Sequence, residues 1–483
     1  MRFFPLLLAT LAACASARGR YAQVTPPPSS NASALDPAGR ARQVANRLTF
    51  GLRPGDIAAI ERMGVDRWID LQLNPERIPD ADAERVLSLL ETQRKKPFEL
   101  IADHPQPQEL QPRLTARVVS DNRRLTPTAN DTMKYRQSVQ TANTLGAEIY
   151  AARMLRAAQS ERQLLEVMVD FWENHFSVSI NKSPNRFALL EYDRDVIRPH
   201  ALGKFRDLLG AVARSPEMLY YLDEWQSIVD SLHPTIPEAQ IETRRAAMAY
   251  PPLGDSTLVQ VVNHRRSGRN ENYARELMEL HTLGVNGGYS QQDVIEVARA
   301  LTGWTIDRPD LGGSFLFRPD WHDAGEKTVL GVRIPAGRGV EDGEQVLDIV
   351  ARHPSTARYI ARKLVVHFVS DSAPPALVER AAQVFLRTDG DIREVMRTII
   401  TSPEFMSAPA YRAKVKTPFE LVVSTLRAMN APPDTTARDA QLVARLGQPI
   451  WGHLTPEGWP DQGDALLNAG SLLNRVNFLT SAA

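Results

Sequence analysis

Residues 164–176 read LLEVMVDFWENHF, a run in which apolar side chains return every three or four positions. This spacing predicts an α-helix over residues 161–176 with one continuous core-facing side. That side carries five apolar residues and ends on a histidine: Leu164, Val167, Met168, Phe171, Trp172 and His175. The acidic and amide residues fall on another face: Asp170, Glu173 and Asn174. His175 is then either a core histidine bonded to a backbone carbonyl, or a metal ligand or general base.

Helical periodicity also dominates the rest of the chain, so we expect a mainly α fold: a large multi-helix globular domain with one small β-hairpin. An N-cap followed by a first-turn proline, Asp36-Pro37, marks where the folded part begins. Helices are expected near residues 37–49, 54–62, 65–73, 81–93, 141–159, 161–176, 187–198, 203–213, 238–249, 269–283, 290–302, 342–352, 355–369, 375–387, 391–400, 416–429 and 435–446. Segments 94–140 and 225–255 are less regular and are expected to form excursions or lids.

One region has a β-like pattern. Ser314 to Phe317 and Thr328 to Val332 are short apolar runs with aromatic or β-branched residues, and the turn-rich sequence RPDWHDAG follows the first of them. The pattern predicts that the two runs pair as one hairpin. Its tip carries polar side chains in a position suited to ligands: His322, Asp323 and Lys327. The alternative is a turn whose aspartate caps its own backbone.

The N-terminus is typical of an exported bacterial lipoprotein. Arg2 and a short apolar run precede Leu11-Ala12-Ala13-Cys14, which has the shape of a lipobox. Residues 1–17 are therefore expected to be a signal peptide with lipidation at Cys14. Two lipid chains there would hold the protein on a membrane.

Sorting and cleavage leave two alternatives open. Ala15 stands where an aspartate would favour retention in the inner membrane, so we expect an outer-membrane-anchored envelope lipoprotein. An ordinary signal peptide cleaved after Ala13 or Ala17 would instead give a periplasmic or secreted protein. The polar, proline-rich residues 18–35 are expected to form a disordered tether.

Composition limits the function classes. The chain has 483 residues, and Lys plus Arg equals Asp plus Glu at 57 each, so it lacks a basic field for nucleic acid. Cys14 is the only cysteine, which excludes disulfides, zinc ribbons and cysteine nucleophiles from the mature domain. Residues 36–483 are expected to form a single α-helical domain, or two lobes at about 36–250 and 251–483.

A second polar helix is expected at 269–283. Asn272, Glu276 and Glu279 lie at positions i, i+4 and i+7 on one face. Arg275 and Glu279 are spaced for a surface salt bridge, which is the simpler interpretation of that pair. His281 falls on the apolar side, so this is not a helical zinc motif with two histidines four residues apart.

Two further patches carry polar or aromatic groups. Residues 358–367 hold Arg362 and Lys363 before an apolar run, which suits either an anion site or a solvated basic face. The C-terminal segments 447–452 and 456–460 place two tryptophans among Pro and Gly. Such residues either stack on sugar rings or belong to a loop pinned to the core.

Several of these motifs together resemble a bacterial family called domain of unknown function 1800. The matching motifs are Asn46 to Asp56, Asn270 to Gly284 with Gly287-Gly288-Tyr289, Ala298 to Trp304, His322-Asp323-x-Gly325-x-Lys327, Gly447-Gln448-Pro449 and Pro456 to Pro460. The resemblance runs from about residue 40 to the end. It implies a secreted protein of undefined chemistry, whose relatives are often encoded beside a second secreted family that resembles sulfatases and phosphatases.

The enzyme hypothesis places five side chains in one cleft roofed by the hairpin: Glu276, Glu279, His175, His281 and His322. They would act as general acid and base in hydrolysis of a saccharide, or hold a divalent metal through His175, Glu276, His281 and His322. Binding roles are expected for Asn272, Arg275, Asp323, Lys327, Trp172 and Trp304. The alternatives are a non-catalytic scaffold that docks a secreted partner and a glycan-binding module.

Overall fold

The computed structural model describes residues 33–104, 129–182, 188–248, 268–309, 313–432 and 434–482. The expected signal peptide, the lipidation site at Cys14 and most of the tether lie outside these residues. The end of the expected tether is already part of the fold, because Leu35 donates its N–H to the Met406 carbonyl at 3.0 Å. Asp36 caps the first helix by accepting the Gly39 N–H, with Pro37 at the first helical position, as the sequence predicts.

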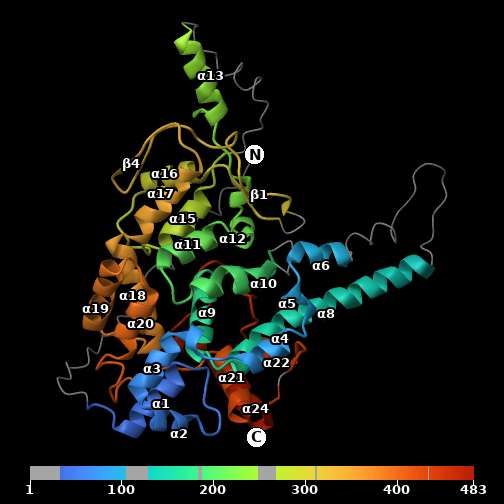
Figure 1. Ribbon diagram of the computed structural model, residues 1–483, viewed down its shortest axis with the longest axis vertical. Coiled ribbons are helices and arrows are strands. Elements are labelled where there is room, and N and C mark those ends of the chain that lie inside the picture. The colour runs from blue at the N-terminus through green and yellow to red at the C-terminus, as the bar shows by residue number, and fades with distance from the viewer. Residues whose placement is uncertain are drawn as a thin grey trace, which may run out of the picture. The chain divides into compact units, whose positions relative to one another are not determined.

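Helices make up most of the described chain, so the mainly α prediction is confirmed (Figure 1). The α-helices are α1 (Pro37–Arg47), α2 (Asp56–Met63), α3 (Val65–Leu73), α4 (Ala81–Leu87), α5 (Glu91–Arg94), α6 (Pro97–Asp103), α8 (Ala129–Gln159), α9 (Gln163–His175), α10 (Ala188–Glu191), α11 (Phe205–Ala213), α12 (Pro216–Tyr221), α13 (Ile236–Ala247), α15 (Glu271–Glu279), α16 (Gln291–Leu301), α17 (Val340–Ala351), α18 (Pro354–Phe368), α19 (Pro375–Arg387), α20 (Ile392–Ile400), α21 (Pro418–Ala428), α22 (Arg438–Arg445), α23 (Gly463–Leu466) and α24 (Ala469–Ala482). Short 3-10 helices are η1 (Pro75–Arg77), η3 (Arg198–His200) and η4 (Glu224–Gln226), and η2 (Tyr192–Ile197) is a π-helix.

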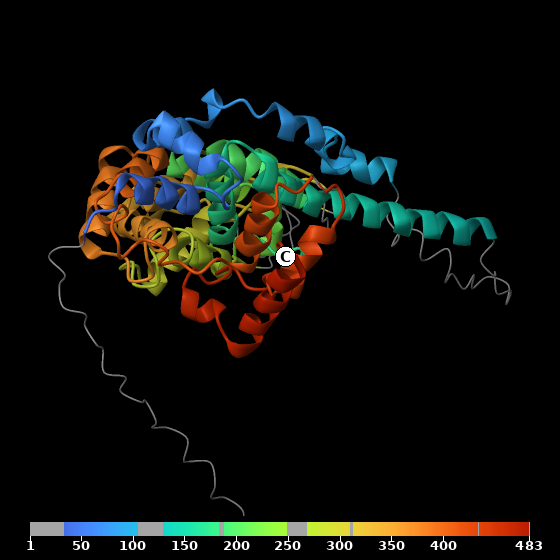
Figure 2. The same ribbon diagram turned by 90° about the horizontal axis from the view of Figure 1, so that it is seen from below.

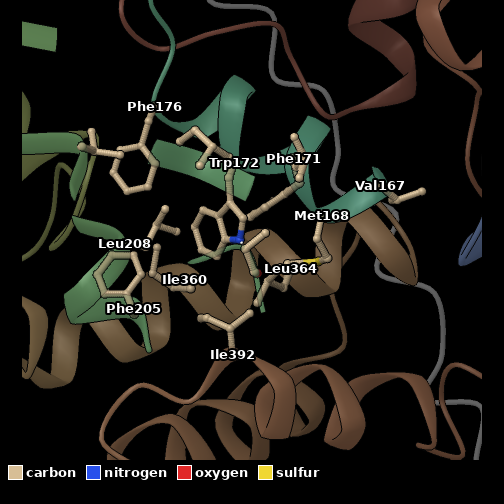
Figure 3. Close-up of a cluster of buried hydrophobic side chains, with 14 of the residues drawn as sticks. Val167, Met168, Phe171, Trp172, Phe176, Phe205, Leu208, Ile360, Leu364 and Ile392 are labelled. Atoms are coloured by element: carbon tan, nitrogen blue, oxygen red, sulfur yellow. Dashed lines mark hydrogen bonds between the residues drawn. The ribbon is translucent and has the colours of Figure 1, made fainter. Parts of the chain in front are cut away.

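Helix α9 forms the middle of the core. Its Trp172 is completely buried, and the indole N–H donates to the Ala201 carbonyl at 2.9 Å. Figure 3 shows this ring among side chains from three other helices: Phe205 and Leu208 of α11, Ile360 and Leu364 of α18, and Ile392 of α20. Helices therefore cover the apolar side of α9 completely, as the stripe in its sequence requires.

The polar side of α9 is covered as well, by α8. The buried residues of α8 are confined to its second half, Ala142–Ala158, which packs against α9, α4, α5, α21 and α22. The first half of α8 lies away from the other helices in both views (Figures 1 and 2). Only this half falls in the segment 94–140 that we expected to be an excursion, and α6 is an additional helix there.

Contacts join the beginning of the folded chain to its end. Arg47 of α1 donates hydrogen bonds to the carbonyls of His367 and Phe368 at the end of α18. Phe50 packs edge-on against Phe419 of α21, with 5.4 Å between ring centroids. The residues from Ala34 onward form a single compact unit.

The β-strands pair differently from the expected hairpin. Strand β2 (Phe315–Phe317) pairs with β1 (Trp304–Ile306), and β3 (Lys327–Val329) pairs with β4 (Val332–Ile334), both antiparallel. The prediction that the first and second apolar runs pair with each other was therefore wrong. The reason is the turn at Leu330-Gly331, where both residues have positive φ, as a two-residue hairpin turn demands.

None of the helices within the described residues is long and apolar enough to cross a lipid bilayer.

Candidate functional site

The polar face of α9 is neutralised by an arginine from the neighbouring helix. Arg153 lies in a stretch of α8 that is otherwise buried and apolar, and its own side chain is 2% exposed. Its Nη2 contacts Asp170 Oδ1 at 2.8 Å and its Nε contacts Glu173 Oε2 at 2.9 Å. One guanidinium therefore holds two carboxyl groups that lie one helical turn apart on α9.

A second arginine binds the other acidic groups nearby. Arg198 contacts Glu166 at 2.6 Å and Asp193 at 2.9 Å. With Arg156, whose field also reaches Glu166 and Asp193, three guanidinium groups face four carboxyl groups, of which three are buried and Asp170 is partly exposed. Since a surplus of buried negative charge is costly, protonation of one carboxyl group is the simplest way to balance the cluster.

Within this cluster, Glu173 is the carboxyl group whose surroundings favour protonation most. Burial raises its pKa well above the ordinary value against the opposing charge of Arg153, and Asp193 and Asp170 raise it further. Burial also raises the pKa of Asp170. Glu173 Oε1 and Arg153 Nη1 have no hydrogen-bond partner within the described part of the chain. The pair therefore keeps one acceptor or acid group and one donor without a hydrogen-bond partner in the described part of the chain.

These two atoms belong to residues that line a cavity of about 70 Å³. That volume accommodates several water molecules or a small polar group. The lining residues come from α8, α9, α18, α21 and the C-terminal loops: Arg153, Asp170, Phe171, Glu173, Asn174, Ser177, Val178, His367, Thr417, Phe419, Gln448, Pro449, Ile450, Trp451, His453, Trp459, Pro460 and Asp461. The two C-terminal motifs of the sequence analysis therefore form one side of it.

Asn174 pins the second of these motifs to α9. Its Nδ2 donates to the Trp459 carbonyl at 2.8 Å, and its Oδ1 accepts the Trp459 N–H at 2.6 Å. The first motif is fixed as well, because Ile180 donates its N–H to the Trp451 carbonyl at 2.8 Å. Trp451 is buried and has a φ of +50°, a strained conformation for this residue. The C-terminal tryptophans thus belong to a loop pinned to the core, one of the two alternatives above.

A histidine and an aspartate complete the cavity. The His367 Nδ1 lies 3.7 Å from Asp461 Oδ1, and the imidazole packs edge-on against Phe171. Burial opposes ionisation of Asp461, but His367 and the nearby Lys363 lower its pKa below the ordinary value. The cavity therefore contains a carboxyl group with a raised pKa and another with a lowered pKa.

The structure brings two of the predicted histidines together beside this cavity. His175 donates from Nε2 to the His281 carbonyl at 3.1 Å, and the ring centroids are 6.3 Å apart. His175 Nδ1 accepts a hydrogen bond from Lys363 at 3.2 Å. Burial and Lys363 lower the pKa of His281 to about 3, and its Nε2 is unpartnered within the described residues. Both imidazoles are thus buried and neutral.

The predicted residues of α15 lie at its surface. Glu279 accepts a hydrogen bond from the Tyr289 hydroxyl at 3.2 Å, rather than pairing with Arg275. Arg275 instead donates to Gln291 at 2.6 Å, and Asn272 is exposed. Partial burial and the neighbouring Glu279 raise the pKa of Glu276. These carboxylates do not line the cavity of Glu173.

The tip residues form a separate buried network. His322 donates from Nδ1 to the Thr302 carbonyl at 2.7 Å, and its Nε2 lies 3.3 Å from Asp342. Lys327 binds Asp342 at 2.7 Å, and Arg299 of α16 binds Asp323 at 2.7 Å. All four charged partners are buried, so the network fixes the β3 region onto α16 and α17.

Convergence of all five predicted catalytic side chains on one cleft is not observed. His175 and His281 contact each other and the His281 N–H donates to the Glu276 carbonyl at 3.0 Å, whereas His322 is enclosed in its own network. In the described ranges, His, Asp and Glu side chains do not gather in a group of three or more that could hold a metal ion. Trp172 and Trp304 are completely buried, so their rings are covered by core residues and not available to a ligand.

The sequence contained weak signals of the residues that were missed. Asp170 and Glu173 were assigned to the other face of their helix, and an arginine inside the Ala-rich run around Arg153 is an unusual core residue. Their pairing joins two different helices, which periodicity within one helix does not reveal. His367 closes the basic patch 358–367, in which the pattern points to Arg362 and Lys363, and Asp461 carries no local signal.

Gly458 is required for the C-terminal loop to reach α9. Its φ is +74°, and a Cβ there would lie 2.2 Å from the Asn174 carbonyl oxygen. Gly458→Ala should therefore break the Asn174–Trp459 hydrogen bonds and raise amide exchange over residues 450–462 about five- to thirtyfold, as a loss of about 1–2 kcal/mol in local stability implies. Gly447→Ala is the control, because Gly447 also has positive φ but no atom within 4 Å. Equal exchange in both variants would contradict the close contact.

His281 should make stability depend on pH. Its pKa is about 3 in the folded protein and about 6.5 in an unfolded chain, so below about pH 6.5 only the unfolded chain binds the proton. The free energy of unfolding should fall as the pH is lowered, by about 2 kcal/mol between pH 7 and pH 5 from this residue alone. In urea unfolding, the decrease in the free energy of unfolding from pH 7 to pH 5 should be smaller by about this amount in His281→Gln.

Glu217→Gln provides a comparison of opposite sign. Glu217 of α12 is buried, and burial raises its pKa to about 8, so it destabilises the fold as the pH rises from about 4.5 to 8. Removing it should make stability increase more steeply with pH. Parallel pH profiles for wild type and both variants would show that neither group titrates as its burial requires.

Comparison with known proteins gives the family but no activity. No similar protein was found among curated sequences, and none was found among solved structures. A family model described as a protein of unknown function (DUF1800) matches residues 43–483 and so covers every residue of the cavity. The chain is a member of the DUF1800 family.

Proposed function

We propose that the protein is a hydrolase that cleaves glycosidic bonds by general acid–base catalysis, with only the glycosidic oxygen and the attacking water inside the small cavity beside α9 and the sugar rings outside it. One observation carries the proposal: Glu173 is a buried carboxyl group with a raised pKa, one oxygen held by Arg153 and the other oxygen unpartnered within the described residues. A carboxyl group kept protonated near neutral pH is the usual proton donor in such reactions. The cell envelope, where the Leu11–Cys14 segment would place the protein, is rich in polysaccharides.

The proposed reaction uses two carboxyl groups with opposite pKa shifts. Glu173 donates its proton to the glycosidic oxygen as the bond from that oxygen to the anomeric carbon breaks. Asp461, kept ionised by His367 and Lys363, removes a proton from the water that attacks the same carbon. The products are two sugar hydroxyl groups, and a proton transfer through water returns both carboxyl groups to their starting states.

The other lining residues support this assignment. Arg153 fixes the orientation of Glu173 and limits the charge that builds up when the proton leaves. Trp459 is partly exposed beside His453, with 4.6 Å between ring centroids, and offers an aromatic edge to a sugar ring. Glu276, Glu279 and His322, which the sequence analysis assigns to the site, have no role in this mechanism.

A non-catalytic accessory role is the second candidate, and one observation favours it. Helix α24 carries exposed apolar side chains at helical spacing: Leu472, Leu473, Val476 and Leu479. An apolar stripe on a surface helix suits docking to a secreted partner. In that case the Glu173 cavity is only a buried ion-pair cluster, and neutralising Glu173 leaves function unchanged.

Glu173→Gln tests the two candidates. Release of reducing ends from a panel of bacterial envelope polysaccharides should fall at least about 100-fold in the variant, because a general acid typically contributes 10²–10⁴-fold. Glu217→Gln is the matched control, since it replaces another buried glutamate outside the cavity. Circular dichroism checks that both variants fold. Full activity in Glu173→Gln, or no hydrolysis of any polysaccharide by the folded wild type, would contradict the proposal.

A further inference from the structure

A basic groove adjoins the cavity of Glu173. It has a volume of about 840 Å³ and is lined on one side by α18, through Arg358, Arg362 and Lys363. Pro460 and Asp461 line both the groove and the cavity, so the two spaces meet at this point of the C-terminal loop. A ligand that lies in the groove therefore reaches the border of the proposed catalytic centre.

The buried histidines fix the position of Lys363. Because His175 donates from Nε2 to the His281 carbonyl, its Nδ1 is the acceptor that faces Lys363. The lysine amine donates one hydrogen bond there and also lies 6.0 Å from the centroid of the Tyr359 ring. The pair of histidines therefore acts as a support for this amine, rather than as catalytic groups.

The basic side chains of the groove outnumber the carboxylates that pair with them. Among the described residues, no carboxylate lies within 4.0 Å of Lys363 or Arg362, whereas Arg358 is paired with Glu379 at 3.1 Å. Lys363 is partly buried, and Asp461 is the acidic group whose field reaches it. A partly buried ammonium group without an ion-pair partner is destabilised, because it has lost part of its hydration. An anion bound beside it would offset that loss, which is not so for a basic residue fully in water.

We infer that this groove binds an anionic sugar residue, so that the substrate of the proposed hydrolase is an acidic polysaccharide. Lys363 and Arg362 would hold a carboxylate or sulfate group on the sugar, and the chain would continue past Asp461 towards Glu173. This inference rests on the proposed function for the cleavage step, but the binding step stands on the groove alone. Guanidinium and ammonium groups together recognise either kind of anion.

Binding to the Glu173→Gln protein separates recognition from cleavage. Titration calorimetry at low salt would use three probes: a galacturonic acid tetramer, a sulfated galactose tetramer and a neutral galactose tetramer. Both anionic probes, or one of them, should bind at least about tenfold more tightly than the neutral one, as one or two charge-assisted contacts imply. The preference should decrease as NaCl is added. Comparing the two anionic probes identifies carboxylate or sulfate as the preferred group.

Variants of the groove provide the decisive comparison. Lys363→Met and Arg362→Gln should each remove most of the anionic preference and leave binding of the neutral probe unchanged. Arg362 is exposed, so its variant retains the fold even where Lys363→Met does not. Arg67→Gln, at an exposed arginine of α3, is the control and should bind like the parent.

The outcomes distinguish failure of this inference from failure of the proposed function. Equal affinity for neutral and anionic probes, no binding of any probe, or unchanged binding in Arg362→Gln would overturn the anionic-sugar site. Anion-selective binding that depends on Arg362, combined with a wild type that hydrolyses no polysaccharide, would retain the site and refute the hydrolase.

Discussion

Helix α9 is largely buried, with ten of its thirteen residues inside the protein, and the compensation of its acidic residues is the constraint on which the rest of the structure depends. Its apolar side packs against α11, α18 and α20 around Trp172, and α8 covers much of the opposite, polar side. Glu166, Asp170 and Glu173 are therefore desolvated, and each needs a guanidinium group from another element. Arg153 and Arg198 do not neutralise all of these carboxyl groups, so the pKa of Glu173 stays raised and its protonated form is favoured.

The proposed site follows from this arrangement. The end of α9 presents Asn174, and the C-terminal loop folds over it through the hydrogen bonds of Trp459. The loop brings Asp461 to the edge of the cavity, where α18 supplies His367 and Lys363. The network of His322, Asp323, Lys327 and Asp342 stabilises a different region, where it attaches β3 to α16 and α17. The two polar clusters therefore have different roles, and the first of them borders the cavity of Glu173.

Local patterns predicted local structure well. The apolar stripe from Leu164 to Trp172 predicted α9, because residues on the buried face of a helix recur every three or four positions. The Asp36-Pro37 pair predicted the start of α1, because Asp36 caps that helix. The strands were found but mispaired. A two-residue turn at Leu330-Gly331 satisfies β3 locally, and β2 finds its partner upstream at Trp304. The partner of a strand depends on which other strand lies beside it in the folded protein. Spacing along the sequence predicts this only in part.

The site was less predictable than the fold because its contacts join distant segments. Glu276 and Glu279 had suitable spacing on one helix face, but that face is partly exposed and its carboxylates bind surface partners. Arg153, Glu173 and Asp461 come from three segments whose proximity depends on tertiary packing, and no helical period connects them.

Protonation of Glu173 is the central claim, and infrared difference spectroscopy between wild type and Glu173→Gln measures it directly. The account predicts a carboxylic acid C=O band, absent from the variant, that persists at pH values above the ordinary glutamate pKa of about 4.3. Loss of that band by about pH 4.5, with a carboxylate in its place, would show that Arg153 holds Glu173 ionised and would contradict the account.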